Sequence, residues 1–228
     1  MRSSKCLLCL SLVVAVAFVF TQALPTEAQI AGMPKLYGEF KMPEVGAYAS
    51  YKVINTKNKA ERITKLAIVG KEKSKKGEDL YWYEVKETDP KTGVVNTVKM
   101  LISGNPQEIG TIHQMIIKSG KDPATELPQE ILGMLNQTPP QKTKVEEPKS
   151  KKLGTEKVKI KKKTFECIHL RYSFKDKTTA EVWTNTKVPF GVVKSTSPEM
   201  TMELLEYGAD AVSAIKEKPE VLEMPEKK

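Results

Sequence analysis

Short runs of β-branched and aromatic residues, separated by turns rich in Gly, Pro, Asn and Asp, recur along most of this chain. Four such runs follow one another between residues 47 and 102, and a second series extends from Gly154 to Tyr207. Side chains alternate between the two faces of a strand, so each run can bury one face against a core. About nine candidate strands predict a mainly β (α+β) fold: a curved antiparallel sheet or incomplete barrel of about 8–10 strands with a few short helices.

The stretch between the two series is less regular. Residues 108–118 fit either a helical face or a buried strand, and residues 129–136 are a candidate short helix. Residues 138–152 contain three prolines and five lysines with almost no apolar residue. Such a segment buries too little surface to offset its ordering entropy, so we predict a flexible basic linker inside the domain.

The N-terminus has the three parts of a secretory signal. Arg2 and Lys5 give a positive start, residues 6–20 form an uncharged apolar run, and small residues follow up to Ala28. We therefore predict a signal peptide over 1–28 and a periplasmic or secreted protein. An uncleaved anchor is the alternative, but the apolar run is shorter than the roughly 20 residues that a bilayer span needs.

The remaining chain is expected to form one domain with short extensions. We place a tether over residues 29–45, a single β-rich domain over 46–217 and a charged tail over 218–228. Residues 209–216 could form a helical turn or two. No second apolar stretch approaches the length of a bilayer span, so no transmembrane span is expected in the mature chain.

The charge of the chain limits its partners. Its 228 residues include 37 Lys and Arg against 28 Asp and Glu, a formal net charge of +9. Basic domains often bind nucleic acid, but an exported protein rarely meets it, so we expect no nucleic-acid partner and favour an anionic envelope surface. The candidate head-group contacts are Lys151, Lys152, Lys162 and Lys163, with a merely solvated segment as the alternative.

Residues for catalysis or metal binding are sparse. The chain has two histidines, His113 and His169, and only Cys167 lies beyond the predicted signal. Zinc sites take three or four such ligands, and the sequence holds neither a Gly-x-Ser-x-Gly elbow nor a phosphate-binding glycine loop. We expect no enzyme, no catalytic residue, no metal and no cofactor, and we interpret Cys167 as a small buried hydrophobe in a strand.

Several apolar side chains are candidates for a ligand site. Tyr81, Tyr83 and Val85 share one face of their strand, while Trp82 points to the other. Such side chains can line an adaptable pocket, or they can simply pack a core. The candidate ligand-binding residues are Tyr81, Tyr83, Val85, Met100, Ile102, Trp183, Met202 and Leu204.

Residues 180–194 (AEVWTNTKVPFGVVK) combine a Val-Trp strand, a polar turn and the motif Val-Pro-x-Gly-Val-Val-Lys. Residues 154–158, followed by a strand containing 165–169, resemble the stretch that precedes this motif in exported bacterial proteins. Over residues 46–208 the chain resembles the lipoprotein-carrier (LolA/LolB-like) superfamily, including members whose domain has no assigned function.

The resemblance implies an incomplete antiparallel barrel around helical segments, with an apolar cavity for acyl chains. It favours a periplasmic binding or carrier module for a lipid or a lipoprotein acyl chain. The alternative is a non-catalytic structural or protein-interaction domain of the envelope, whose sheet is filled by its own side chains.

Overall fold

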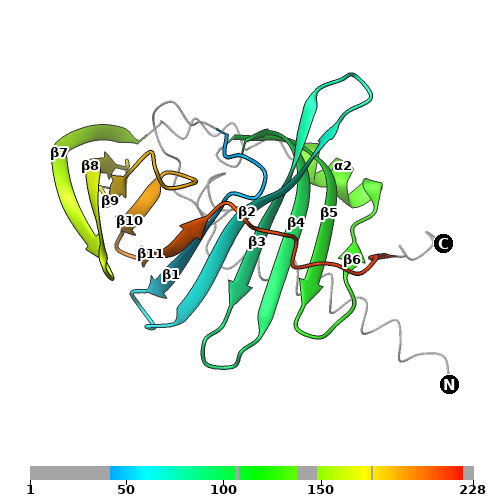
Figure 1. Cartoon of the computed structure of the whole chain (residues 1–228), viewed down its shortest axis with the longest axis horizontal. Helices are drawn as coiled ribbons and strands as arrows, with labels where there is room; N and C mark the ends of the chain where they lie inside the picture. Colours follow the sequence, from blue (N-terminus) through cyan, green and yellow to red (C-terminus); the bar gives the residue numbers. More distant parts are fainter. Residues whose placement is uncertain (1–41, 106–107, 138–147, 176, 223–228) are drawn as a thin grey trace.

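The computed structural model describes residues 42–105, 108–137, 148–175 and 177–222 (Figure 1). They form one 12-stranded sheet with one helix, α2 (Gln129–Gln137). The strands are β1 (Tyr48–Asn55), β2 (Glu61–Lys73), β3 (Asp79–Thr88), β4 (Val95–Asn105), β5 (Glu108–Ser119), β6 (Thr125–Glu126), β7 (Lys149–Ile160), β8 (Lys163–Ser173), β9 (Thr179–Thr184), β10 (Val192–Thr196), β11 (Met200–Gly208) and β12 (Glu220–Val221).

The sheet consists of two meanders that are joined at its centre: the first meander is β1–β6 and the second is β7–β11. Its strand order is β12-β6-β5-β4-β3-β2-β1-β11-β10-β9-β8-β7, so neighbours in the chain are neighbours in the sheet except at two places. At the centre, β1 pairs with β11 in an antiparallel register that runs from Tyr48–Gly208 to Asn55–Met200. At one end, β12 pairs with β6 in the single parallel pairing of the described sheet.

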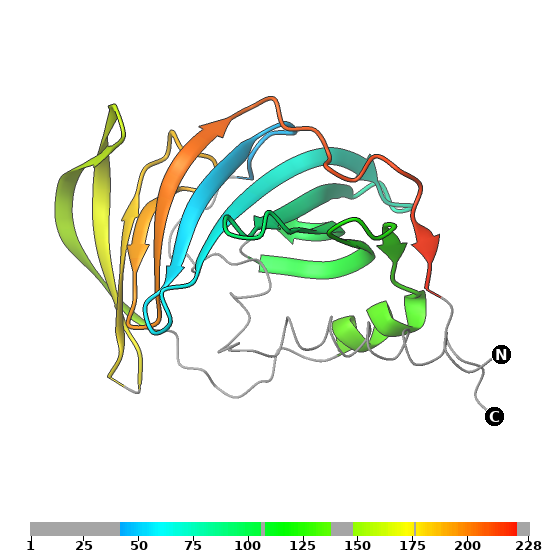
Figure 2. The ribbon, with the colours of Figure 1, turned by 90° about the horizontal axis from the view of Figure 1, so that it is seen from below.

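The sheet is curved like an arch and is not closed into a barrel (Figure 2). The helix α2 lies on its concave side. The strands β7 and β8 form one end of the arch, and β6 and β12 form the other. Among the described residues, no helix is long and apolar enough to cross a membrane.

The mainly β, antiparallel prediction is confirmed. The sheet has more strands than the 8–10 expected, because β6 and β12 add two pairings of only two residues each. The ambiguous segment 108–118 is a strand, β5, and the predicted short helix is α2.

The predicted domain limits lie partly outside the described residues. This holds for the signal peptide and for all of the tether except its last four residues, of which Met42 packs against the core. Within the predicted flexible linker, the residues Lys149–Lys152 belong instead to the edge strand β7. Within the predicted charged tail, Glu220–Val221 form β12.

The C-terminal strap (residues 209–222) crosses the convex side of the sheet in an extended form, without the helical turn expected there (Figures 1 and 2). The buried carboxylate of Glu84 on β3 accepts hydrogen bonds from the Ser213 hydroxyl (2.8 Å) and from the Ala214 amide (3.0 and 3.1 Å). Ile215 is buried in a small cluster with Ile116 of β5. These contacts hold the strap across the first meander.

Candidate functional site

The pairing register brings most of the predicted ligand-binding residues onto one face of the sheet. Tyr83 on β3 lies opposite Met100 on β4, Tyr81 lies opposite Ile102, and Val85 belongs to the same alternating set. Directly paired residues of antiparallel strands project their side chains to the same face. The other face of β5 and β3 carries the strap, so this set faces the concave side of the arch.

The second meander contributes two more predicted residues to the same face. Leu204 lies opposite Tyr51 on β1, and Met202 lies opposite Val53 two residues further along that strand. Tyr51 and Ala49 are two residues apart on β1 and share a face of the sheet. Ala49 lies opposite Leu66 on β2, which in turn lies opposite Val85 on β3. Seven of the eight predicted residues therefore gather in what we call the concave cluster: Tyr81, Tyr83, Val85, Met100, Ile102, Met202 and Leu204.

Side chains of the protein itself fill the space under the concave cluster. The turn between β9 and β10 inserts Val188 and Phe190, which are each 2% exposed, and the Phe190 ring lies 6.1 Å from that of Tyr83. Tyr51 donates a hydrogen bond from its hydroxyl to the carbonyl of Val192 (3.2 Å), which fixes the end of this turn. On the other side, α2 inserts Leu132, which is 1% exposed.

Among the described residues these side chains pack in a core, which is one of the two alternatives that the sequence left open. Tyr83 and Ile102 are fully buried, and burial raises the pKa of the Tyr83 hydroxyl above its usual range. Two surface depressions are present elsewhere, and of the predicted residues only Met202 lines either of them.

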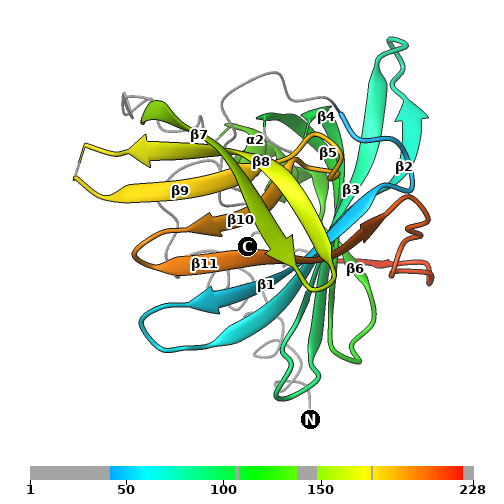
Figure 3. The ribbon, with the colours of Figure 1, turned by 60° about the vertical axis from the view of Figure 1, so that its left-hand side comes forward.

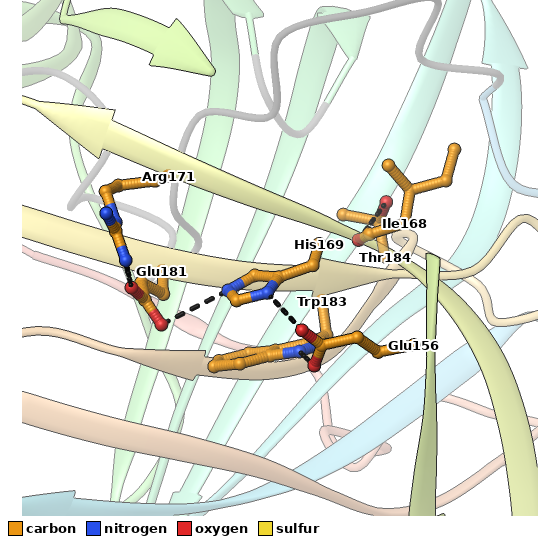
Figure 4. A network of polar contacts seen from close by, with 7 residues as sticks. All are labelled: Glu156, Ile168, His169, Arg171, Glu181, Trp183 and Thr184. Atoms are coloured by element: carbon orange, nitrogen blue, oxygen red, sulfur yellow. Dashed lines mark hydrogen bonds and ion pairs between the residues drawn. The ribbon is translucent and has the colours of Figure 1, made fainter. Parts of the chain in front are cut away.

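The eighth predicted residue, Trp183, lies on the opposite face. It is adjacent to Val182 on β9 and pairs with Lys194 on β10 and His169 on β8. Its ring stacks on the imidazole of His169 with a centroid distance of 4.2 Å and an interplanar angle of 17°. Trp183 is buried in the same hydrophobic core, but on the other face of the sheet it joins a polar network (Figure 4).

Two carboxylates hold the imidazole of His169 between them in this network. Nδ1 lies 2.8 Å from Oε1 of Glu156 on β7, and Nε2 lies 3.1 Å from Oε2 of Glu181 on β9 (Figure 4). The indole of Trp183 donates to the second oxygen of Glu156 at 2.8 Å, and Arg171 donates to Oε1 of Glu181 at 2.9 and 2.7 Å. The imidazole thus lies between one carboxylate from each neighbouring strand.

The hydrogen bonds favour the ionised form of both acids. Donation from Trp183 and then His169 lowers the pKa of Glu156, and the guanidinium of Arg171 lowers the pKa of Glu181. Both nitrogens of His169 lie within hydrogen-bond distance of a carboxylate. The described residues contain no group of three or more potential metal ligands. The network links β7 to β9 across β8.

Cys167 lies beside this network on β8. Its side chain is fully buried, and burial raises the pKa of its thiol to about 11. A protonated, inaccessible thiol is a poor nucleophile, in keeping with the interpretation of Cys167 as a buried hydrophobe.

The predicted head-group lysines separate into two pairs. Lys151 and Lys152 lie near the start of β7, whereas Lys162 and Lys163 lie at the turn that follows it. At about 3.3 Å per residue, roughly 30 Å of strand separates the pairs. All four are exposed, and the nitrogen of Lys163 lies 4.8 Å from the ring centroid of Tyr207.

Sequence reasoning missed two of the residues that fill the concave side. Val188 and Phe190 fall in a turn, where alternation carries no information about burial. Their apolar character within a Val-Pro-Phe-Gly turn was the available signal, because an exposed turn rarely carries two large apolar side chains.

The described residues form one open β-sheet whose concave face is covered by side chains of the same chain. No protein-family model matches the sequence, and no curated protein matches it. Among solved structures, a candidate lipoprotein from Parabacteroides distasonis ATCC 8503 is similar, with a TM-score of 0.39 and 11% sequence identity, over 73% of this chain and 97% of that chain. The lipoprotein-carrier resemblance stays a prediction from the sequence motif.

Proposed function

We propose that this protein is a non-catalytic binding module of the cell envelope that holds an apolar ligand, such as a lipid or an acyl chain, against the concave cluster. The observation that carries the proposal is the small size of the element that covers that cluster. Within the described part of the chain, the cover on the side of β5 is one nine-residue helix, α2.

The helix α2 is held by few contacts. Among residues 129–136 of this helix Leu132 is the one fully buried side chain, and the side-chain amide of Asn136 exchanges two hydrogen bonds with the backbone of Ile112 (2.9 and 2.8 Å). Met134 and Leu135 of the same helix remain 63% and 44% exposed. Ile131 is partly buried against the core, so α2 is anchored to the sheet by one face.

A comparison of burial energies favours displacement of α2 by a ligand. Burial of one leucine side chain contributes about 1.5–3 kcal/mol, whereas each buried methylene contributes about 0.8 kcal/mol. An acyl chain that buries about ten methylenes therefore gains more than α2 loses by leaving the sheet. No polar recognition is needed for such a ligand.

Binding of a palmitate labelled with a fluorescent nitrobenzoxadiazole group tests the proposal. We expect the purified protein to bind this probe, and Leu132→Ala to tighten binding several-fold, because a weaker cover leaves more of the binding-competent state. Met134→Ala, at an exposed position of the same helix, serves as the matched control and should bind like the wild type. Native mass spectrometry after mild lipid extraction should show the same ligand mass in the untreated protein.

The second candidate is a structural or protein-interaction domain, and the inserted Phe190 turn favours it. If the folded wild type and the folded Leu132→Ala variant both fail to bind the probe, and no lipid is extracted, the concave cluster is only a core. The carrier proposal would then be abandoned in favour of this second candidate. Circular dichroism of both proteins establishes that they are folded.

A further inference from the structure

The positive charge of this protein is concentrated in one element of the sheet. The cationic hairpin, which we define as β7, the turn Lys161–Lys162 and β8 (residues 149–173), contains eight lysines and one arginine against two glutamates. Its formal charge is +7, whereas that of the whole chain is +9. The rest of the chain is close to electrically balanced.

The lysines of the cationic hairpin have no acidic partners within the described part of the chain, whereas several lysines of the first meander do. All eight are exposed, and no ion pair joins any of them to a carboxylate. By contrast, Lys52 pairs with Glu61 at 2.9 Å and Lys71 pairs with Asp79 at 2.7 Å. One glutamate of the hairpin, Glu156, is already occupied by His169 and Trp183.

The hairpin presents these lysines at the free edge of the sheet. Strand β7 is the last strand in the sheet order and stands at the end of the arch (Figures 2 and 3). Along β7, Val158 and Ile160 face the core, so the alternating residues Lys157 and Lys159 face away from it. A strand of 12 residues spans about 40 Å at 3.3 Å per residue, so the charge forms a long stripe.

The hairpin is anchored, so the stripe has a fixed shape. Glu156 on β7 is bonded to His169 on β8 and, across β8, to Trp183 on β9 (Figure 4). A charged stripe that is already ordered loses less conformational entropy on binding than a mobile lysine tail.

Exposed apolar side chains accompany the lysines. Ile168 on β8 is 40% exposed and Leu153 on β7 is 36% exposed. Unpaired cations beside exposed aliphatic side chains fit the interface of an anionic bilayer, where phosphate groups lie next to acyl chains. We infer that the cationic hairpin docks on the surface of an anionic lipid membrane, through its lysines and these two aliphatic side chains.

Sedimentation with lipid vesicles tests this inference. We expect the purified protein to bind vesicles with 30% phosphatidylglycerol at low salt, to bind pure phosphatidylcholine vesicles far less, and to dissociate at about 0.5 M salt, where screening is strong. The triple variant Lys157→Gln, Lys159→Gln, Lys162→Gln should weaken binding roughly 100-fold, since each lysine near such a surface contributes roughly five-fold.

The matched control removes the same charge at a different place. Lys75→Gln, Lys76→Gln, Lys91→Gln changes three exposed lysines in the turns of the first meander and should alter binding less than two-fold. An equal loss in both triple variants would mean that net charge alone drives binding, and the docking site would be wrong. Binding to a soluble polyphosphate without binding to the anionic vesicles would also overturn the inference. Neither assay depends on a ligand at the concave cluster, so this inference and the proposed function can fail separately.

Discussion

At the scale of single residues, the turn of the cationic hairpin contains a backbone conformation that side chains with a Cβ rarely adopt. Ile160 pairs with Lys163, so Lys161 and Lys162 form a two-residue turn, and Lys161 has a φ of 51°. Two-residue hairpin turns require positive φ values, which glycine adopts without a steric penalty. The sequence places a charged residue where glycine would be favoured, so charge at this tip is present despite a local steric cost.

Substitution Lys161→Gly should stabilise the protein by about 1 kcal/mol, because it removes the Cβ clash at positive φ. Lys162→Gly, the control in the same turn, should be neutral or slightly destabilising, since Lys162 is not in the positive-φ region. Urea unfolding followed by circular dichroism measures both changes. A loss of stability in Lys161→Gly would show that the hairpin tip does not have this conformation.

A second residue-scale prediction concerns Cys167. Because its thiol is buried and its pKa is raised to about 11, it should not react with Ellman's reagent in the native processed protein. In denaturant, one thiol per chain should react at once. Rapid reaction without denaturant would place Cys167 at the surface and contradict the described core.

At the scale of elements, the turn between β9 and β10 inserts its apolar side chains into the core on the concave side of the sheet. Hydrogen bonds between Asn185 and Gly191 (2.8 Å) and between Gly191 and Val188 (2.9 Å) close the turn, and Phe190 has a φ of 64°. Phe190 therefore has an unfavourable backbone conformation at the position where its ring contacts Tyr83. Through this contact the second meander packs on β3 of the first.

Substitution Phe190→Ala should lower the free energy of unfolding by about 3–5 kcal/mol, because it leaves a cavity in a packed core. Phe174→Ala is the matched control, because Phe174 is 42% exposed, and its effect should stay below about 1 kcal/mol. Urea denaturation midpoints of the two variants provide the comparison. Equal losses would mean that the turn does not insert into the concave side.

At the scale of the whole molecule, several ionised acids contribute to folding. In each, contacts with cations or with N–H donors hold the pKa of the carboxyl below its ordinary value. The affected residues are Asp79, Asp89, Glu156, Glu181 and Glu217. A carboxyl with a lowered pKa in the folded state stabilises folding when it is ionised in both states, and this contribution disappears as pH falls through the folded pKa.

The melting temperature should therefore be nearly constant from pH 7 to about pH 5 and should fall as the pH is lowered below about 4.5. Glu156→Gln should reduce the melting temperature at pH 7 and make the acid-side fall shallower, because one of the lowered carboxyls is absent. Differential scanning calorimetry at a series of pH values measures both effects. An unchanged acid-side slope would show that Glu156 does not contribute through its ionised form.

The sequence predicts the strands well and their partners poorly. Period-two alternation correctly groups Tyr81, Tyr83 and Val85, because it depends only on neighbouring residues. The same alternation places Val182 and Trp183 on opposite faces of their strand. It does not say which of the two faces the concave side, because that depends on the β1–β11 pairing between distant segments. The high lysine content of residues 149–152 suggested a linker because composition does not distinguish a solvated segment from an exposed edge strand.

The sheet order has a consequence for how the chain can be divided. The two meanders are continuous in sequence, and the break between them falls between α2 and β7, so a cut there divides no strand. Two separately produced polypeptides would then carry complementary halves of one interface: the edges of β1 and β11, the Phe190 ring against Tyr83, and the strap across Glu84. Such fragments should reassemble without a covalent link. Their reassembly would then measure how strongly β1 and β11 pair.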